Sequence, residues 1–297
     1  MTQTRTDLSR SILSVLAYSD LFDYPLKAEE TRRFLDTQCA LSDVAECLST
    51  DEKIGSQDGY FFLKGRDAIV EIRRTRELVS TKPMKRAMLY GRIIGALPFV
   101  RMAAITGSLA THNLSKNADM DFMLVSRRGR VWTARAFALL LGRLARLFGD
   151  VICPNVIVSE SALEWNARNL YAAREFAQMI PVSGWVVYER LLQANSWVRD
   201  FFPNFGSDAS SWKENSMFPM LQKVFEFLLN GKLGGWFEAW EMKRKIARFQ
   251  KQAGYGLETQ FSAEICQGNF DHHGAWAMEK YHARLKEVLP QGSEIVP

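Results

Sequence analysis

The sequence predicts an α+β protein in three parts: an N-terminal winged helix, a small core with a mixed sheet, and a helical C-terminal domain. Three observations support this division. Helix-spaced segments are followed by a hairpin pattern, two apolar strands flank a loop that contains glycine, and helical periodicity dominates the last part of the chain. The expected boundaries are residues 1–66, 67–160 and 161–297.

Length and composition allow two or three small domains. The chain has 297 residues, a formal charge of +5 and a pI near 9.0, which suits anionic substrates such as nucleotides. The four cysteines lie far apart and form no Cys-x-x-Cys pair. A zinc knuckle and a dense disulfide framework are therefore excluded.

The sequence contains no segment typical of a signal peptide or a membrane span. The first residues are polar, and the most apolar run, 136–141, is followed directly by Gly142 and Arg143. We therefore expect a cytoplasmic protein with no membrane partner. Its oligomeric state is left open.

The N-terminal part has the element order of a winged helix. Helices are expected over 8–23, 28–35 and about 42–49, followed by a hairpin over 53–63 that turns at Asp58-Gly59. The third helix would be the recognition helix, but it carries two acids and no base, which suits DNA phosphates badly. Packing against a neighbour or binding a protein is favoured over binding DNA.

Residues 67–97 are helical in pattern and rich in Arg and Lys. Pro83 is expected to divide this region into two helices. Such a charge run is most often a solvated face, and an RNA-binding track is the alternative.

The core pattern comes next. Strands are expected over 99–106, 119–125 and 151–158, with a helix over 130–148. From Ser161 onward the pattern is helical almost throughout. The Trp residues of that region are expected to lie mostly in its core.

The segment that indicates chemistry runs from Ala104 to Val125. An apolar strand leads into Gly107-Ser108, and ten residues later Asp119-Met120-Asp121 opens the next strand. Side chains two apart on a strand share a face, so the two aspartates should project together with Met120 in the core. Two adjacent carboxylates repel unless a cation lies between them, and Mg²⁺ is the expected cation.

The Gly-Ser pair suits a phosphate ligand. Glycine lets the backbone approach a phosphate closely, and the Ser108 hydroxyl with nearby N–H groups can bond its oxygens. The alternative is a surface loop in which the aspartates only stabilise a turn.

This pattern resembles the DNA polymerase beta nucleotidyltransferase superfamily, in which a strand, Gly-Gly or Gly-Ser, about ten residues and Asp-x-Asp follow in order. The resemblance covers roughly residues 85–160. More closely, the chain is similar to uncharacterised bacterial nucleotidyltransferase-domain proteins with an N-terminal winged helix. Tyr-Ser-Asp-Leu-Phe-Asp-Tyr-Pro (18–25) and Ile-Cys-Pro-Asn (152–155) are typical of them.

The resemblance implies that residues 67–160 form a nucleotidyltransferase core. In it, Asp119 and Asp121 would be catalytic and hold the metal, and Gly107 and Ser108 would contact the triphosphate. Lys116, in the connecting loop, is a further candidate for the triphosphate, whereas His112 is expected to be solvated.

One departure from the family concerns the third carboxylate. Active members usually carry it on a later strand, but here Asn155 stands in the candidate strand. An amide cannot accept a proton as a base does, which puts two-metal chemistry in doubt. Asp150 and Glu160 flank that strand and are weaker substitutes. Asp271-His272-His273 resembles the signature of a phosphoesterase family, but the further acidic motifs of that family are missing here. The triplet is therefore expected only to start a helix or to form a surface cluster.

The expected activity is transfer of a nucleoside monophosphate from a triphosphate, with ATP the expected nucleotide, to an unidentified acceptor. RNA, including transfer RNA, or a small molecule could be that acceptor. The alternative is a degenerate nucleotidyltransferase fold that acts through its winged helix as a nucleic-acid-binding or regulatory module.

Overall fold

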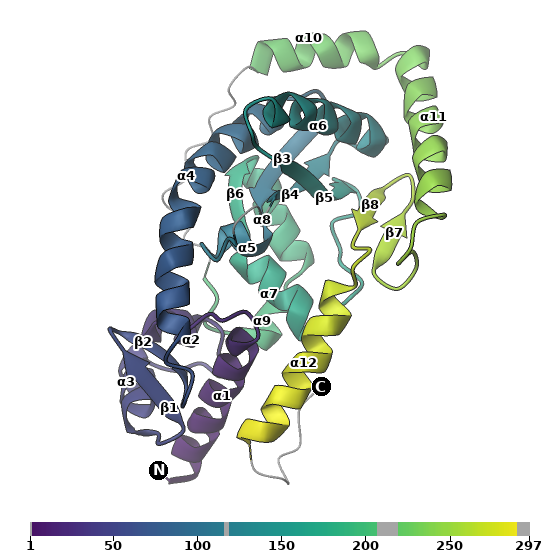
Figure 1. Ribbon diagram of the computed structural model, residues 1–297. Coiled ribbons are helices and arrows are strands. Elements are labelled where there is room, and N and C mark those ends of the chain that lie inside the picture. The colour runs from purple at the N-terminus through teal and green to yellow at the C-terminus, as the bar shows by residue number, and fades with distance from the viewer. Residues whose placement is uncertain (1, 116–118, 207–218, 290–297) are drawn as a thin grey trace.

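A mixed six-stranded sheet forms the centre of the molecule (Figure 1). The structure, a computed structural model, describes residues 2–115, 119–206 and 219–289, with side chains from residue 6 onward. The strand order is β6-β3-β4-β5-β8-β7, and only the β4–β5 pair is parallel. The strands are β3 (Val100–Ile105), β4 (Met120–Ser126), β5 (Ile152–Ser159), β6 (Ile180–Ser183), β7 (Thr259–Phe261) and β8 (Ile265–Gly268).

Helices cover both faces of this sheet, as the nearly continuous apolar runs of its central strands β3 and β4 require. In β4, Phe122 and Leu124 pack into the cluster formed with α4 (Ile69–Gly95), α6 (Val131–Arg146) and α11 (Lys232–Phe249). Met123 and Val125 pack into the opposite cluster. That second cluster contains α7 (Leu170–Gln178), α8 (Trp185–Ala194) and α9 (Val198–Phe201).

The N-terminal part has three helices and a hairpin in the expected order. They are α1 (Thr2–Asp20), α2 (Ala28–Arg33), α3 (Leu41–Thr50), β1 (Ile54–Gln57) and β2 (Tyr60–Leu63). The hairpin turns at Asp58 and Gly59, whose φ values of 54° and 80° fit a two-residue turn with two left-handed positions. The elements are therefore those that the sequence predicts.

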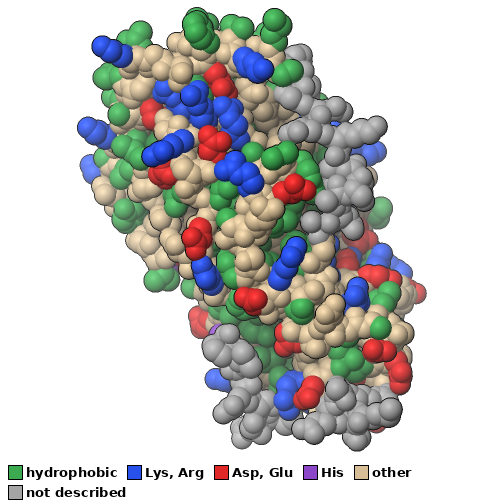
Figure 2. All heavy atoms as spheres, turned by 180° about the vertical axis from the view of Figure 1, so that it is seen from behind, with side chains coloured by type: hydrophobic (Ala, Val, Ile, Leu, Met, Phe, Trp, Pro, Cys, Tyr) green, Lys and Arg blue, Asp and Glu red, His purple; other side chains and the backbone are tan. Residues whose placement is uncertain are grey.

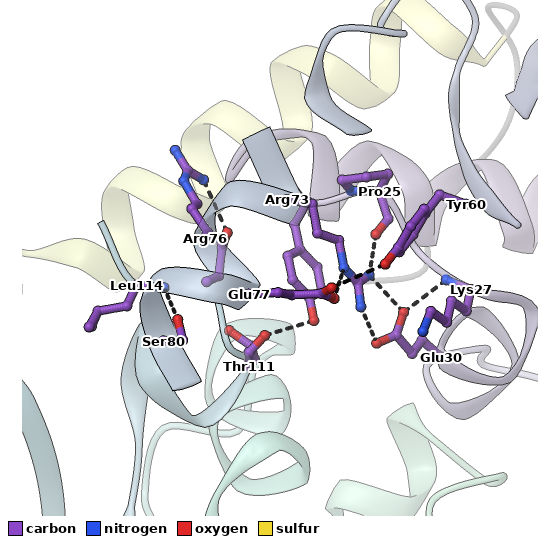
Figure 3. Close-up of polar contacts among 12 residues, drawn as sticks. Pro25, Lys27, Glu30, Tyr60, Arg73, Arg76, Glu77, Ser80, Thr111 and Leu114 are labelled. Atoms are coloured by element: carbon purple, nitrogen blue, oxygen red, sulfur yellow. Dashed lines mark hydrogen bonds and ion pairs between the residues drawn. The ribbon is translucent and has the colours of Figure 1, made fainter. Parts of the chain in front are cut away.

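The α4 helix is continuous, so the expected division at Pro83 is wrong. It joins the N-terminal part to the sheet (Figure 1). Near its start, the buried Arg73 lies between the rings of Tyr24 and Tyr60, with ring centroids 4.2 and 4.8 Å from its guanidinium carbon. The same guanidinium pairs with Glu30 and Glu77 (Figure 3). Tertiary contacts of this kind override the local effect of one proline.

The expectation of helices almost throughout 161–297 is wrong in one respect. The three short strands β6, β7 and β8 come from this region and join the sheet beside β3 and β5. The expected boundary at residue 160 therefore does not separate the sheet from the C-terminal part of the chain. The remaining helices in the described part of the chain are α5 (Gly107–Ala110), α10 (Pro219–Leu229) and α12 (His273–Val288).

The α12 helix packs against α1, so distant parts of the sequence lie side by side (Figure 1). Arg284 donates a hydrogen bond of 2.9 Å to Asp20, and the rings of Tyr281 and Tyr18 meet edge to face. None of the helices within the described ranges combines the length and apolar character that a bilayer crossing requires.

Candidate functional site

The two aspartates lie where β4 begins. Met120 is buried in the cluster on one face of the sheet. Asp121 is partly buried and, by the alternation of the strand, lies on the opposite face with Met123. Asp119 is exposed directly before the strand. Its negative charge contributes to raising the pKa of Asp121, so the two carboxylates repel each other.

The glycine turn lies against this pair. Thr106 N–H donates a hydrogen bond of 3.0 Å to the Asp121 carbonyl, which brings the end of β3 beside the start of β4. The short helix α5 (Gly107–Ala110) follows at once. Gly107 has a φ of +65°, and a Cβ placed on it would lie only 2.6 Å from Asp121 Oδ2. The absence of a side chain at Gly107 is therefore what allows the Asp121 carboxylate to lie there.

Burial dominates the electrostatics of Asp121. It raises the pKa of this carboxyl to about 7, the charge of Asp119 adds to the increase, and a hydrogen bond from Asn155 opposes it. Asn155 Nδ2 lies 2.6 Å from Asp121 Oδ1. The β4–β5 register pairs Phe122 with Pro154 and Met123 with Val156, so Asn155 is an extra residue at a bulge.

A further carboxylate, which the sequence did not single out, belongs to this neighbourhood. Glu175 lies on α7, which contacts α5. Burial raises the pKa of Glu175 to about 7, and the charge of Asp121 contributes. The only signal in the sequence was an acid beside Arg174 in an amphipathic helix, and that pattern is too common to indicate a site.

The two acids that flank β5 lie elsewhere. Asp150 is buried, pairs with Arg86 and accepts a hydrogen bond of 2.6 Å from Tyr90. Glu160 follows the far end of β5, where Ser159 pairs with Ser126 at the other end of β4 from Asp121. Neither acid therefore completes the site.

Two aspartates and a bare glycine fit a magnesium–triphosphate complex better than a fully protein-bound metal. Among the residues that the structure describes, no three His, Cys, Asp or Glu side chains are grouped so as to hold a metal ion. Mg²⁺ is commonly held by one or two carboxylates together with substrate phosphates and water. Asp119 and Asp121 match this pattern, and the missing side chain at Gly107 is what lets the Asp121 carboxylate lie against the turn. Lys116 lies outside the described residues.

The loop that follows α5 is hydrogen-bonded to the N-terminal part. Tyr24 Oη donates a hydrogen bond of 2.8 Å to the Thr111 carbonyl, and Leu114 N–H bonds Ser80 Oγ on α4 at 3.2 Å (Figure 3). Asn113 Nδ2 donates to the Phe22 carbonyl at 3.1 Å. Phe22 and Tyr24 belong to the 18–25 segment noted in the sequence. That segment therefore supports the loop over residues 111–114.

Two cavities were found away from the aspartates. One, of about 460 Å³, lies between α4 and Leu114-Ser115, next to the same loop. The other, of about 330 Å³, lies between the 127–130 turn and α11. Neither cavity has Asp119 or Asp121 among the described residues that line it.

The histidines take the roles that the sequence favours. His112 is exposed with a φ of 54°. His272 is the N-cap of α12 and His273 its first residue, which confirms that the Asp-His-His triplet starts a helix.

Comparison with protein-family models, with curated proteins and with solved structures finds no match for this chain.

Proposed function

We propose that this protein is a cytoplasmic, Mg²⁺-dependent nucleotidyltransferase that transfers a nucleoside monophosphate from a triphosphate, preferably ATP. The observation that carries the proposal is the position of the Asp121 carboxylate against the bare Gly107 turn, with Asp119 beside it. The proposed fold has three corresponding parts: a winged helix, a nucleotidyltransferase core and a largely helical C-terminal part.

The proposed roles follow from the chemistry of each group. Asp119 and Asp121 hold Mg²⁺, which neutralises charge on the phosphates and on the leaving pyrophosphate. Gly107 and Ser108 contact the triphosphate through backbone N–H groups and the serine hydroxyl. Asn155 fixes the orientation of Asp121 through its 2.6 Å hydrogen bond.

In the reaction, an acceptor oxygen attacks the α-phosphorus, the bond to the β-phosphate breaks, and pyrophosphate leaves. The acceptor hydroxyl must lose its proton. Glu175 suits this role, because a carboxylate with a pKa near 7 accepts a proton efficiently at neutral pH.

RNA or a small molecule is the proposed acceptor. The exposed residues of α3 include Asp43 and Glu46 and no base, so the winged helix is not assigned to DNA. On α4, four arginines form ion pairs with acids of this chain and are already engaged: Arg73, Arg74, Arg76 and Arg86. This favours an acceptor that approaches the loop after α5 over an acceptor that binds along α4.

The test is incubation of the full chain with α-labelled nucleoside triphosphates, Mg²⁺, and either pooled RNA or a small-molecule extract. The control is Asp119→Asn/Asp121→Asn, which keeps side-chain size. We expect labelled product and released pyrophosphate from the native chain only. Product that forms equally with the control would refute catalysis at this site. A complete lack of product with specific RNA binding by both proteins would instead support the degenerate, nucleic-acid-binding alternative.

A further inference from the structure

The helix α10 is docked with its polar side chains inward and its apolar side chains outward. Gln222 Nε2 donates hydrogen bonds of 2.9 and 3.0 Å to the carbonyls of Leu97 and Val100. Glu226 accepts from Phe99 N–H at 2.7 Å and pairs with Arg101 at 2.8 Å. No side chain of α10 is buried. This is the reverse of the usual amphipathic arrangement, in which the apolar face meets the protein.

The exposed apolar surface continues into α11. We call α10 and α11 with their connection, residues 219–249, the outer hairpin. Phe227 is 83% exposed, Leu233 85% and Trp236 65%. Six further large apolar side chains of the hairpin are exposed: Met220, Leu221, Val224, Phe225, Leu228 and Trp240.

The size of this surface exceeds what a free monomer normally shows. With roughly 150–250 Å² for a large apolar or aromatic side chain, these residues expose on the order of 1,000 Å². The largest apolar patch of a typical monomer is about 300–600 Å². The expectation that the Trp residues lie in the core is accordingly wrong for Trp236 and Trp240, whose rings stack on each other outside it. The surface therefore calls for something that covers it.

The charges of the hairpin point to an anionic partner. All three of its acids are engaged: Glu226 pairs with Arg101, Glu238 accepts hydrogen bonds from the first N–H groups of α6, and the buried Glu241 pairs with Arg244. Besides Arg244, the hairpin carries five further bases: Lys223, Lys232, Lys243, Lys245 and Arg248. Figure 2 shows Lys and Arg side chains gathered in the upper half of the rear face, with hydrophobic side chains along its upper rim.

The 330 Å³ cavity beside the hairpin adds to this positive field. Arg127, Arg128 and Arg130 line it from the turn before α6. Arg130 is buried, with an exposed fraction of 8%, and its Nη1 has no hydrogen-bond partner among the described residues. The Arg130 guanidinium lies over the Phe99 ring, whereas Arg127 is half-buried and Arg128 exposed, so the last two are the guanidinium groups that a phosphate can reach.

We propose that the outer hairpin binds the surface of an anionic phospholipid bilayer. Its Leu, Phe and Trp side chains enter the interface, and the surrounding bases with Arg127 and Arg128 contact headgroup phosphates. A second copy of the chain fits the hairpin worse, because a two-fold contact would bring the same bases face to face. The expectation that the protein has no membrane partner rested on the lack of a spanning segment, and a surface contact needs none.

Flotation of the full chain with lipid vesicles tests this proposal. One set contains phosphatidylcholine alone, and the other has roughly one third phosphatidylglycerol, enough for a strongly negative surface. We expect the native chain to float with the anionic vesicles and at least about tenfold less with the neutral ones, since each base near such a surface strengthens binding several-fold. High salt should weaken the binding.

Matched variants distinguish vesicle binding by the outer hairpin from nonspecific binding through other exposed apolar side chains. Phe227→Ser/Leu233→Ser should lower anionic-vesicle binding at least about tenfold, because two inserted apolar side chains are lost. Leu78→Ser/Leu147→Ser changes residues 78% and 79% exposed on α4 and next to α6, and it should leave binding unchanged. Circular dichroism melts establish that both variants fold.

Lack of flotation with anionic vesicles would overturn the proposal, as would equal loss in the two variants. A native dimer that Phe227→Ser/Leu233→Ser converts to monomer, without vesicle binding, would assign the surface to a second copy instead.

Discussion

Replacement of Gly107 by alanine tests the arrangement of the candidate site most directly. The new Cβ would lie 2.6 Å from Asp121 Oδ2, whereas ordinary contact begins near 3.4 Å. The carboxylate must therefore retreat by about 0.8 Å. Misplacement of a reacting group by about 1 Å lowers a rate by roughly a hundredfold. We expect nucleotidyl transfer by Gly107→Ala to fall by about ten- to a hundredfold.

Gly129→Ala is the matched control. Gly129 has a φ of +68°, close to the +65° of Gly107, but nothing lies within 4 Å of its added Cβ. Both variants bear the strain of a left-handed alanine, about 1–2 kcal/mol in the free energy of unfolding. Only Gly107→Ala displaces a carboxylate.

Pyrophosphate release and thermal denaturation of both variants provide the readout. The reasoning is refuted if the two variants lose activity equally, because strain alone would then explain the loss. It is also refuted if Gly107→Ala keeps full activity despite the displaced carboxylate.

Three further predictions concern the same region. In the absence of metal, Asp121 should lower the free energy of unfolding progressively as pH rises from about 4 to about 7, because the folded state binds its proton with a pKa of about 7 against an ordinary value of 3.8. Glu175, whose pKa is also raised to about 7, should contribute a decrease of the same sign. Asp121→Asn should flatten this decrease in pH-dependent denaturation, and an unchanged slope would contradict the assignment. Asn155→Asp removes the hydrogen bond to Asp121 and adds a third negative charge, so it should destabilise the metal-free protein by about 1–3 kcal/mol. The same change should tighten Mg²⁺ binding measured by calorimetry. Unchanged Mg²⁺ affinity would place residue 155 outside the metal's reach. Tyr24→Phe removes the hydrogen bond to the Thr111 carbonyl and should lower the free energy of unfolding by about 0.5–1.5 kcal/mol. Amide hydrogen exchange in the 111–114 loop should be faster in this variant. Exchange as slow as in the native chain would show that this bond does not hold the loop.

The elements around the site could be predicted because their patterns are local. The alternation in 119–125 and the spacing from Gly107 to Asp119 predict two neighbouring strands joined by a loop. The structure has those strands in antiparallel register, with Ile105 opposite Phe122. The turn at Asp58-Gly59 was equally local, since few residues adopt two successive left-handed conformations.

Features set by tertiary contact could not be predicted in this way. The strands β6, β7 and β8 have three or four residues each, too few for a period to show. They are defined by pairing: β6 with β3, β8 with β5, and β7 with β8. Pro83 stands in a helix that long-range contacts hold at both ends. Glu175 meets the field of Asp121 only because α7 folds onto that face of the sheet.

The orientation of α10, with its polar face toward the protein, could not be predicted for another reason. Its pattern gives an amphipathic helix correctly, but periodicity does not say which face meets the protein. Gln222 and Glu226 determine that choice through backbone groups near Val100, about 120 residues away in sequence. Neither partner can be recognised without the fold.

The contact between α1 and α12 has a consequence for biosynthesis. A ribosome releases α1 early, and α3, β2 and Arg66, which contact it, follow soon after, whereas α12 is translated far later. Nascent chains must therefore carry the α12-facing side of α1 uncovered for most of their synthesis, and closure of this long loop is expected to be slow. Premature termination before Tyr281 would leave that side exposed to chaperones and proteases.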